Sequence, residues 1–156
     1  MRKRRMDKQT EAPIPNREWL DVEQLATVEF SSEDPDFPIE GALVPGHDAG
    51  WRAAGPGEQI IRLSFDEPLS ITLIQLLFIE NNTERTQEFM LRWSRDSDGP
   101  MEEIVRQQYH FSPPTTTTEI EDYGLQLEGV RVLELSIIPD ISGGQARAVL
   151  EELRLA

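Results

Sequence analysis

The sequence contains no cysteine, only two histidines and, beyond residue 8, no lysine. The lack of cysteine excludes a disulfide scaffold, a thiolate zinc site and a cysteine nucleophile, so the fold has to be stabilised by packing. Long apolar runs are missing as well. None approaches the roughly 20 residues of a membrane-spanning helix, and no hydrophobic stretch follows the basic residues 2–5. We therefore expect a soluble, cytoplasmic protein.

The length of 156 residues predicts one compact domain, because single domains commonly span roughly 100 to 200 residues. Residues 1–17 are mostly polar and include Pro13 and Pro15. Such a segment does not form a packed element, and we interpret it as a flexible lead. The folded domain is expected to span residues 18–156.

Acidic residues outnumber basic ones by 29 to 15, which gives a net charge of −14. Residues 1–10 carry +4, and the rest of the chain carries −18. An acidic body disfavours nucleic acid and anionic membranes, and leaves neutral sugars, cations or another protein as partners. The basic start of the chain either contacts an anionic partner or is simply solvated. All ten bases after residue 8 are arginine, which fits bidentate recognition of acidic groups as well as a coding bias.

Short apolar runs separated by turn residues predict an all-β domain, a sandwich or a barrel. Ile61, Leu63 and Phe65 alternate with polar residues, which is the period of a half-buried strand. The run 71–79 is apolar at both parities and predicts a central strand. The seven predicted strands are 25–31, 58–66, 69–80, 87–95, 102–111, 117–127 and 131–139.

The segments between and after these strands carry further signals. The Asp-Glu-Pro sequence at residues 66–68 predicts a turn that ends a strand. Residues 32–50 form the longest irregular stretch, which is typical of a functional loop. The C-terminal residues 145–156 are ambiguous, and their local pattern slightly favours a helix.

Several motifs follow one another in a defined order along residues 25–155. In the first half, the pair Glu40-Gly41 leads a long loop into Trp51, followed by LSFDEP at 63–68 and ITLIQL at 71–76. In the second half, FMLRWSRD at 89–96, VLELSII at 132–138 and LEELRL at 150–155 follow in turn. This series resembles the discoidin-type, or coagulation factor type C, domain. The resemblance implies an antiparallel eight-stranded jelly roll of the galactose-binding-like kind, with a strand rather than a helix at the C-terminus.

The resemblance also implies what the domain does. Such domains and the related carbohydrate-binding modules bind sugars, phospholipid head groups or proteins through loops at one end of the sandwich, often beside a structural calcium. Matched residue by residue, the calcium ligands would be Glu40, Asp48 and Glu152, and calcium does prefer carboxylate and carbonyl oxygens. This chain has Glu-Gly where the family has Asp-Gly, and a longer loop before the tryptophan. The alternative is that these three acids are solvated loop charges.

Five residues are candidates for ligand contact. Trp51 could stack on a sugar ring while Arg52 donates to its hydroxyl or carboxylate groups, although the matching tryptophan of the family packs in the core. His47 lies in a glycine-rich part of the loop, where it either contacts a hydroxyl group or is merely exposed. Asn81 and Arg85 belong to a polar turn after the central strand. This turn either contacts the ligand or is only a hairpin connection between two strands.

No catalytic constellation is recognisable. The adjacent acid pairs Glu102-Glu103 and Glu121-Asp122 point to opposite faces of a strand and cannot flank one bond. We therefore predict a non-catalytic binding module whose ligand class is carbohydrate. The alternative is a domain for protein–protein interaction or homo-oligomerisation, and an enzyme is a distant third.

Overall fold

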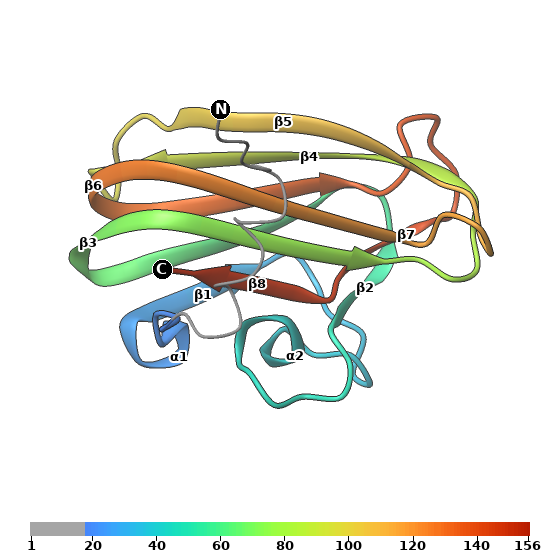
Figure 1. The fold of residues 1–156 in the computed structure, drawn as a ribbon, viewed down its shortest axis with the longest axis horizontal. Helices are drawn as coiled ribbons and strands as arrows, with labels where there is room; N and C mark the ends of the chain where they lie inside the picture. The colour runs from blue at the N-terminus through green and yellow to red at the C-terminus, as the bar shows by residue number, and fades with distance from the viewer. Residues whose placement is uncertain (1–17) are drawn as a thin grey trace, which may run out of the picture.

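The computed structural model describes residues 18–156, so the predicted flexible lead, residues 1–17, lies outside the described part of the chain. Within that part the fold is an antiparallel β-sandwich of eight strands, which confirms the predicted fold class (Figure 1). Two helices of four residues each lie at one edge of the sandwich. In chain order the elements are α1 (Val22–Leu25), β1 (Ala26–Phe30), α2 (Glu40–Leu43), β2 (Trp51–Pro56), β3 (Gln59–Ile79), β4 (Arg85–Ser94), β5 (Glu102–Phe111), β6 (Thr118–Ile138), β7 (Arg147–Leu150) and β8 (Glu152–Leu155).

Two long strands, β3 and β6, run through both layers of the sandwich. They pair with each other from Gln59 opposite Ile137 to Ile79 opposite Thr118. The first half of β3 and the second half of β6 form one layer with β1, β4 and β5. The other halves form the second layer, with β8 at its edge. The short strands β2 and β7 pair with each other near one end of the sandwich.

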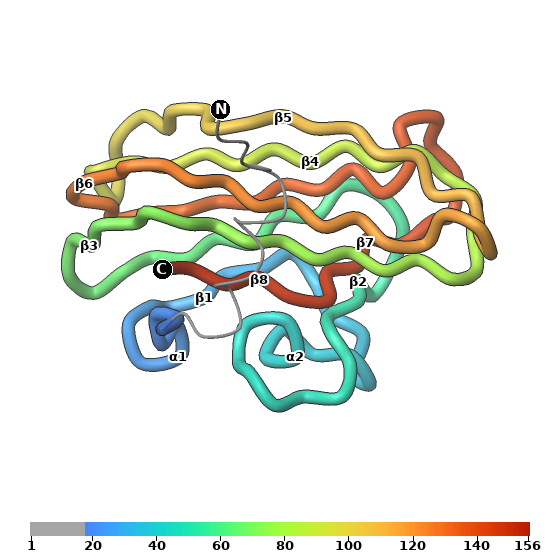
Figure 2. The backbone as a smooth tube through the Cα atoms, in the orientation of Figure 1, coloured from blue at the N-terminus to red at the C-terminus, as the bar shows by residue number. Residues whose placement is uncertain are grey.

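Both long strands fold back at the same corner (Figure 2). The pairing shifts register between Ser64 and Leu69, and Gly129 on β6 has a φ of 71°. A bulge bends a strand and increases its twist, and glycine adopts a positive φ without steric cost. The predicted strand break at residues 66–68 is therefore wrong. The chain bulges there and continues, so that the predicted strands 58–66 and 69–80 are two halves of β3.

The core lies between the layers and follows the period-2 pattern. Ile61, Leu63 and Phe65 are all buried, whereas the intervening Arg62 and Ser64 are only half-buried, as predicted. The inward faces of β4 and of the second half of β6 extend this side of the core. The second half of β3 supplies the opposite side, where the Phe78 ring lies 5.3 Å from the Phe89 ring of β4. Each fully buried apolar side chain of this size stabilises the fold by roughly 1.5–3 kcal/mol. These alternating side chains hold the two layers together.

The outer face of the first layer carries a row of charges across its three central strands. Glu134 on β6 lies opposite both Arg62 on β3 and Arg92 on β4, and it is 1% exposed. It accepts hydrogen bonds from Arg62 Nε at 2.8 Å and Nη2 at 2.6 Å, and from Arg92 Nη2. Burial alone would raise the pKa of Glu134, but the bonds from the two guanidinium groups outweigh it and lower that pKa. The ion pairs therefore stabilise the alignment of the three strands.

The C-terminal segment forms β7 and β8, so its local preference for helix is wrong and the strand implied by the family resemblance is confirmed. Ala148, Leu150, Leu153 and Leu155 bury their side chains in the core.

The predicted loop 32–50 contains the short helix α2 and ends where β2 begins at Trp51. Among residues 18–156, no helix has the length and apolar character needed to span a membrane.

A matched pair of substitutions on β6 tests the core. Ile137 is fully buried and Ile120 is 61% exposed. We expect Ile137→Ala to lower the free energy of unfolding by about 3 kcal/mol through lost contacts and a residual cavity. Ile120→Ala should change it by less than about 1 kcal/mol. Urea denaturation of both variants measures the difference, and equal effects would contradict the assignment of Ile137 to the core.

Candidate functional site

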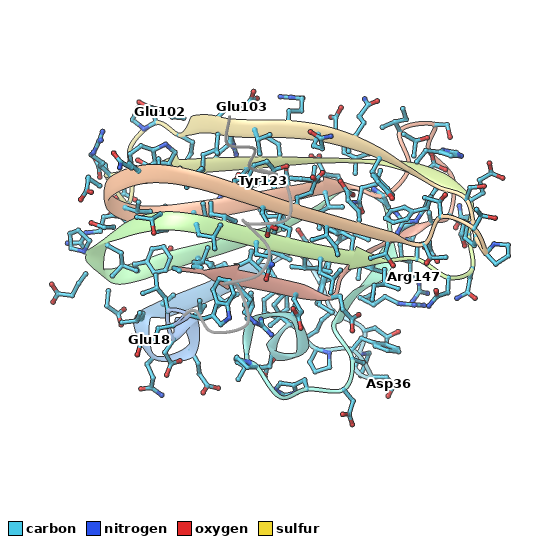
Figure 3. All side chains as sticks on the ribbon, viewed as in Figure 1. Glu18, Asp36, Glu102, Glu103, Tyr123 and Arg147 are labelled. Atoms are coloured by element: carbon cyan, nitrogen blue, oxygen red, sulfur yellow. The ribbon has the colours of Figure 1, made fainter. Side chains whose placement is uncertain are left out.

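Three segments meet at the end of the sandwich opposite the corner. They are the β3–β4 turn, the connection from β6 to β7, and the β2–β7 pair. Figure 3 shows Arg147 at this end and Glu102 and Glu103 at the other. Between the segments lies a cavity of about 200 Å³, here called the loop-end pocket. It is lined by Arg52, Glu80, Asn82, Thr83, Gln145, Ala146, Arg147 and Val149.

The pairing of β2 with β7 positions two arginines in this pocket. Arg52 is opposite Val149, and Arg147 lies two residues before Val149, so its side chain is on the same face. The Arg52 guanidinium carbon lies 5.1 Å from the centre of the Phe37 ring. Arg147 Nη1 is 3.7 Å from Asp34 Oδ2. Both cations are therefore held at the pocket by neighbours in the long loop.

The β3–β4 turn is held by a buried ion pair. Glu80 accepts hydrogen bonds from Arg85 Nε at 2.8 Å and from the backbone N–H groups of Asn82 at 3.0 Å and Thr83 at 3.3 Å. Arg85 is 2% exposed and donates to the carbonyl oxygen of Pro139 at 2.7 Å. Burial would raise the pKa of Glu80, but the Arg85 and backbone bonds lower it overall. This carboxylate therefore shapes the turn and is already neutralised by its partner.

A second buried acid lies beneath the turn, on the first half of β6. Glu119 is 1% exposed, and its Oε1 accepts a hydrogen bond from Gln87 Nε2 at 3.0 Å. Its other oxygen has no partner among residues 18–156. Burial, followed by the neighbouring Glu121, raises the pKa of Glu119 to about 9. Burial therefore favours the protonated, uncharged form of the Glu119 side chain in the fold.

The predicted ligand residues are not all brought together. Arg52 lines the loop-end pocket. Trp51 is 2% exposed and donates from Nε1 to the carbonyl of Ser32 at 2.9 Å, so it has no open face for a sugar. Arg85 is buried under the turn. Asn81 and His47 are exposed, but neither lines the pocket.

The sequence interpretation missed part of this pocket. Asn82 lies in the polar turn predicted at Asn81 and Arg85 but is not among the predicted ligand residues, and Arg147 and Gln145 are not singled out at all. No local pattern marks these two residues. They become neighbours of Arg52 only through the pairing of β2 with β7.

The predicted calcium ligands do not form a metal site. No group of three potential metal-ligating side chains occurs among residues 18–156, so Glu40, Asp48 and Glu152 are not brought together. The carbonyl oxygen of Ala42, in the helix that Glu40 begins, accepts a hydrogen bond from Arg154 Nη1 at 2.8 Å. Arg154 Nη2 is also 3.8 Å from Glu152 Oε1. A buried guanidinium thus ties α2 to β8.

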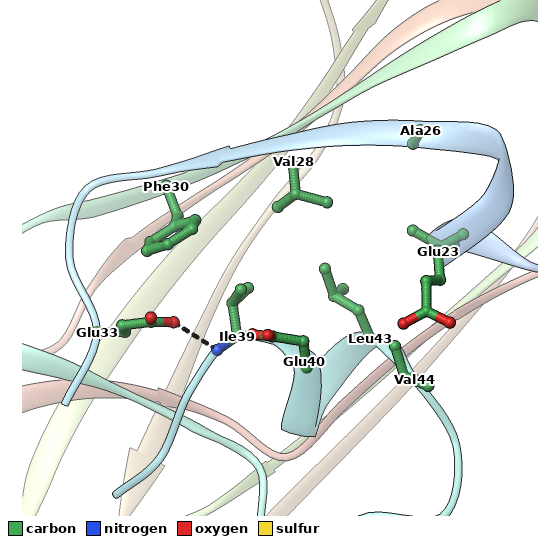
Figure 4. A pocket seen from close by; sticks show the side chains of 10 residues that line it. Glu23, Ala26, Val28, Phe30, Glu33, Ile39, Glu40, Leu43 and Val44 are labelled. Carbon is green, nitrogen blue, oxygen red and sulfur yellow. Dashed lines mark hydrogen bonds between the residues drawn. The ribbon is translucent and has the colours of Figure 1, made fainter. Parts of the chain in front are cut away.

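A second cavity, of about 290 Å³, lies between β1 and α2 (Figure 4). Its walls are mainly apolar and include Val28, Phe30 and Leu43. Two of its three carboxylates, Glu23 and Glu40, are exposed. The third is Glu33, whose Oε2 accepts a hydrogen bond from the backbone N–H of Ile39 at 2.8 Å. This groove offers few hydrogen-bond donors to a sugar, in contrast to the loop-end pocket.

No family model matches the sequence, and no curated protein sequence matches it either. Solved structures do match. A family 32 carbohydrate-binding module of C. perfringens NanJ, solved with galactose, has a TM-score of 0.63 and 10% identity, over 88% of this chain and 96% of that one. A second module from Clostridium perfringens, solved with GalNAc-β-1,3-galactose, has a TM-score of 0.64 and 16% identity, over 88% of this chain and 99% of that one.

A third match consists of two family 32 domains of Clostridium perfringens ZmpB. Its TM-score is 0.65 at 12% identity, and the match covers 96% of this chain and 38% of that one. At such identities the similarity shows the fold. This chain has the jelly-roll fold of these carbohydrate-binding modules. The fold implied by the motifs is thereby confirmed.

Calcium is expected to leave the stability of the protein unchanged. A cation that binds only the folded state raises the melting temperature in proportion to the logarithm of its concentration. Because Glu40, Asp48 and Glu152 form no common site, the melting temperature at 5 mM calcium chloride and at 5 mM EDTA should agree within about 1 °C. A shift of several degrees that Glu152→Gln abolishes would contradict this interpretation.

The buried acid Glu119 predicts a pH dependence of stability. Its pKa is about 9 in the fold against an ordinary value of 4.5 for glutamate, so between these values the folded state retains a proton that the unfolded state has lost. Stability should therefore fall as pH rises between these two values. We expect Glu119→Gln to keep the bond from Gln87, to flatten this fall and to melt at a higher temperature than wild type at pH 8.

Thermal melts from pH 5.5 to 8.5 test this expectation. The control is Glu102→Gln, which alters an exposed carboxylate at the far end of β5. It should melt in parallel with wild type at every pH. If Glu119→Gln also runs parallel to wild type, Glu119 is ionised in the fold and the expectation is wrong.

Proposed function

We propose that this domain is a non-catalytic carbohydrate-binding module that holds a sugar in the loop-end pocket. The observation that carries the proposal is a set of polar residues that three separate segments bring together at one cavity. Asn82, Thr83 and Gln145 offer amide and hydroxyl groups, and Arg52 and Arg147 offer guanidinium groups. Ligand sites of this kind combine a few convergent polar groups with a preformed hollow.

The composition of the pocket suits a sugar. Amide and hydroxyl groups both donate and accept hydrogen bonds, as sugar hydroxyls do. Val149 and Ala146 add apolar surface for the C–H groups of a ring. The cavity of about 200 Å³ is smaller than the roughly 300–1,000 Å³ of pockets for drug-sized ligands. We therefore expect it to take one sugar residue, such as the end of a chain.

The structural neighbours support a carbohydrate ligand. They are carbohydrate-binding modules, and two of them were solved with galactose and with GalNAc-β-1,3-galactose. The fold by itself does not determine the ligand, since one fold hosts many functions. The support for this chain comes from the position of its own polar residues at the loop end.

The pocket is suited to binding rather than to hydrolysis. Glycoside hydrolysis commonly needs two carboxyl groups on either side of the scissile bond. Among the described residues that line the pocket, Glu80 is the single carboxylate, and it is paired with the buried Arg85. A group held in this way shapes the turn and does not act as a general acid.

A neighbouring pair of asparagines tests the site. Asn82 lines the pocket, whereas Asn81 is exposed beside it and does not. A panel of neutral and acidic oligosaccharides is first screened on the full-length protein, and the best binder is measured by calorimetry. We expect Asn82→Ala to weaken that binding about tenfold, the effect of one lost hydrogen bond with its partner left unpaired. Asn81→Ala should stay within about twofold of wild type.

Two results would contradict the proposal. One is equal loss in both asparagine variants, which would place the ligand outside the pocket. The other is the absence of binding to any saccharide at millimolar concentration. Protein association would then be the remaining candidate, and the apolar groove beside Phe30, which is 38% exposed, would be the surface to examine.

A further inference from the structure

We propose that the loop-end pocket selects an acidic sugar, a uronic acid residue whose carboxylate binds between Arg52 and Arg147. This inference rests on the proposed function and names its ligand class. It departs from the expectation of a neutral ligand that the overall charge of −14 suggests.

Arg52 and Arg147 differ from every other arginine in residues 18–156. Each of the others donates at least one side-chain hydrogen bond within that range. These are Arg62, Arg85, Arg92, Arg95, Arg106, Arg131 and Arg154. Arg52 and Arg147 donate none there. Arg147 approaches Asp34 only to 3.7 Å, which is longer than a hydrogen bond. The two guanidinium groups with unused donors line the same pocket.

Their arrangement favours an anion. Both arginines line the same cavity, although the pairing of β2 with β7 shifts register between Arg52 and Pro56. A carboxylate in this cavity meets two guanidinium groups. A guanidinium group also matches a carboxylate through two parallel hydrogen bonds, and such charge-assisted bonds are stronger than those to neutral hydroxyl groups.

The remaining lining groups do not oppose an anion. Glu80 is neutralised by Arg85 at 2.8 Å, and the other residues that line the pocket are uncharged apart from the two arginines. Asp34 lies beside Arg147, with 3.7 Å between its Oδ2 and Nη1 of Arg147, and offsets part of that charge. Acidic groups more than about 8 Å from the pocket act on the ligand only weakly, because they are largely screened at physiological salt. Local charge at the pocket, and not the net charge of the chain, therefore determines its preference.

Calorimetry on the full-length protein tests this selectivity with ligands that differ only at C6. Trigalacturonate carries a carboxylate there, and galactotriose carries a hydroxymethyl group. We expect trigalacturonate to bind at least tenfold more tightly. Arg52→Ala and Arg147→Ala should each abolish most of this preference. Arg52→Lys and Arg147→Lys should retain part of it, because the charge remains while the paired donors are lost.

Two controls accompany these variants. Arg106→Ala removes an exposed guanidinium from β5, outside the pocket, and should leave the preference unchanged. Sodium acetate at the concentration of the trisaccharide shows whether a carboxylate alone binds. Melting temperatures of all variants identify any that fail to fold.

The outcomes separate this inference from the proposed function. Equal or tighter binding of galactotriose would overturn the acidic-sugar inference and leave the carbohydrate-binding module intact. A uronate preference that survives both alanine substitutions would also overturn it. Absence of binding to either trisaccharide and to the rest of the panel would contradict the proposed function and this inference with it. A tenfold preference for trigalacturonate that falls in Arg52→Ala and Arg147→Ala but not in Arg106→Ala would support the acidic-sugar inference.

Discussion

The pairing of β3 with β6 is the constraint on which the rest of the structure depends. The two strands remain paired through a shared corner, so that each contributes to both layers of the sandwich. The edges of this pair hold β1 and β4 in one layer and β8 in the other. Because both strands reverse at the corner, their free ends emerge together at the opposite end. The β3–β4 turn and the connection to β7 therefore meet at the loop end, where the pocket forms.

Buried charges in this domain serve mainly to fix local geometry. Glu134 aligns three strands through two arginines, and Glu80 with Arg85 holds the turn that presents Asn82. Breaking such a pair would leave an unpaired buried charge, which is strongly unfavourable. Seven of the nine arginines in residues 18–156 donate a side-chain hydrogen bond to another residue of that range. Arg52 and Arg147 donate none there, and this difference distinguishes them.

Particular residues show what could be predicted from the sequence. The alternation of Ile61, Leu63 and Phe65 predicted a half-buried strand correctly, since side chains of a strand point to alternate faces. Residues 66–68 were predicted as a break because proline lacks a donor, yet a bulge accommodates them within β3. Arg52 was recognised as a ligand candidate, but its neighbour Trp51 is buried in the core. Local pattern does not reveal which of two adjacent residues faces inward at the end of a long loop.

The sequence by itself determined the all-β class, most of the strands and, through the order of its motifs, the jelly roll. The class and the strands follow from short-range periodicity and from the spacing of turns, whereas the jelly roll is what the resemblance of the motifs to the discoidin-type domain implies. The tertiary structure alone decided which distant side chains share the pocket. Arg147 meets Arg52 through the register of β2 and β7, and Asn82 joins them because β3 folds back at its corner. It also decided that Glu40, Asp48 and Glu152 do not meet. Long-range register and the path of the chain set these distances, and no local pattern encodes them.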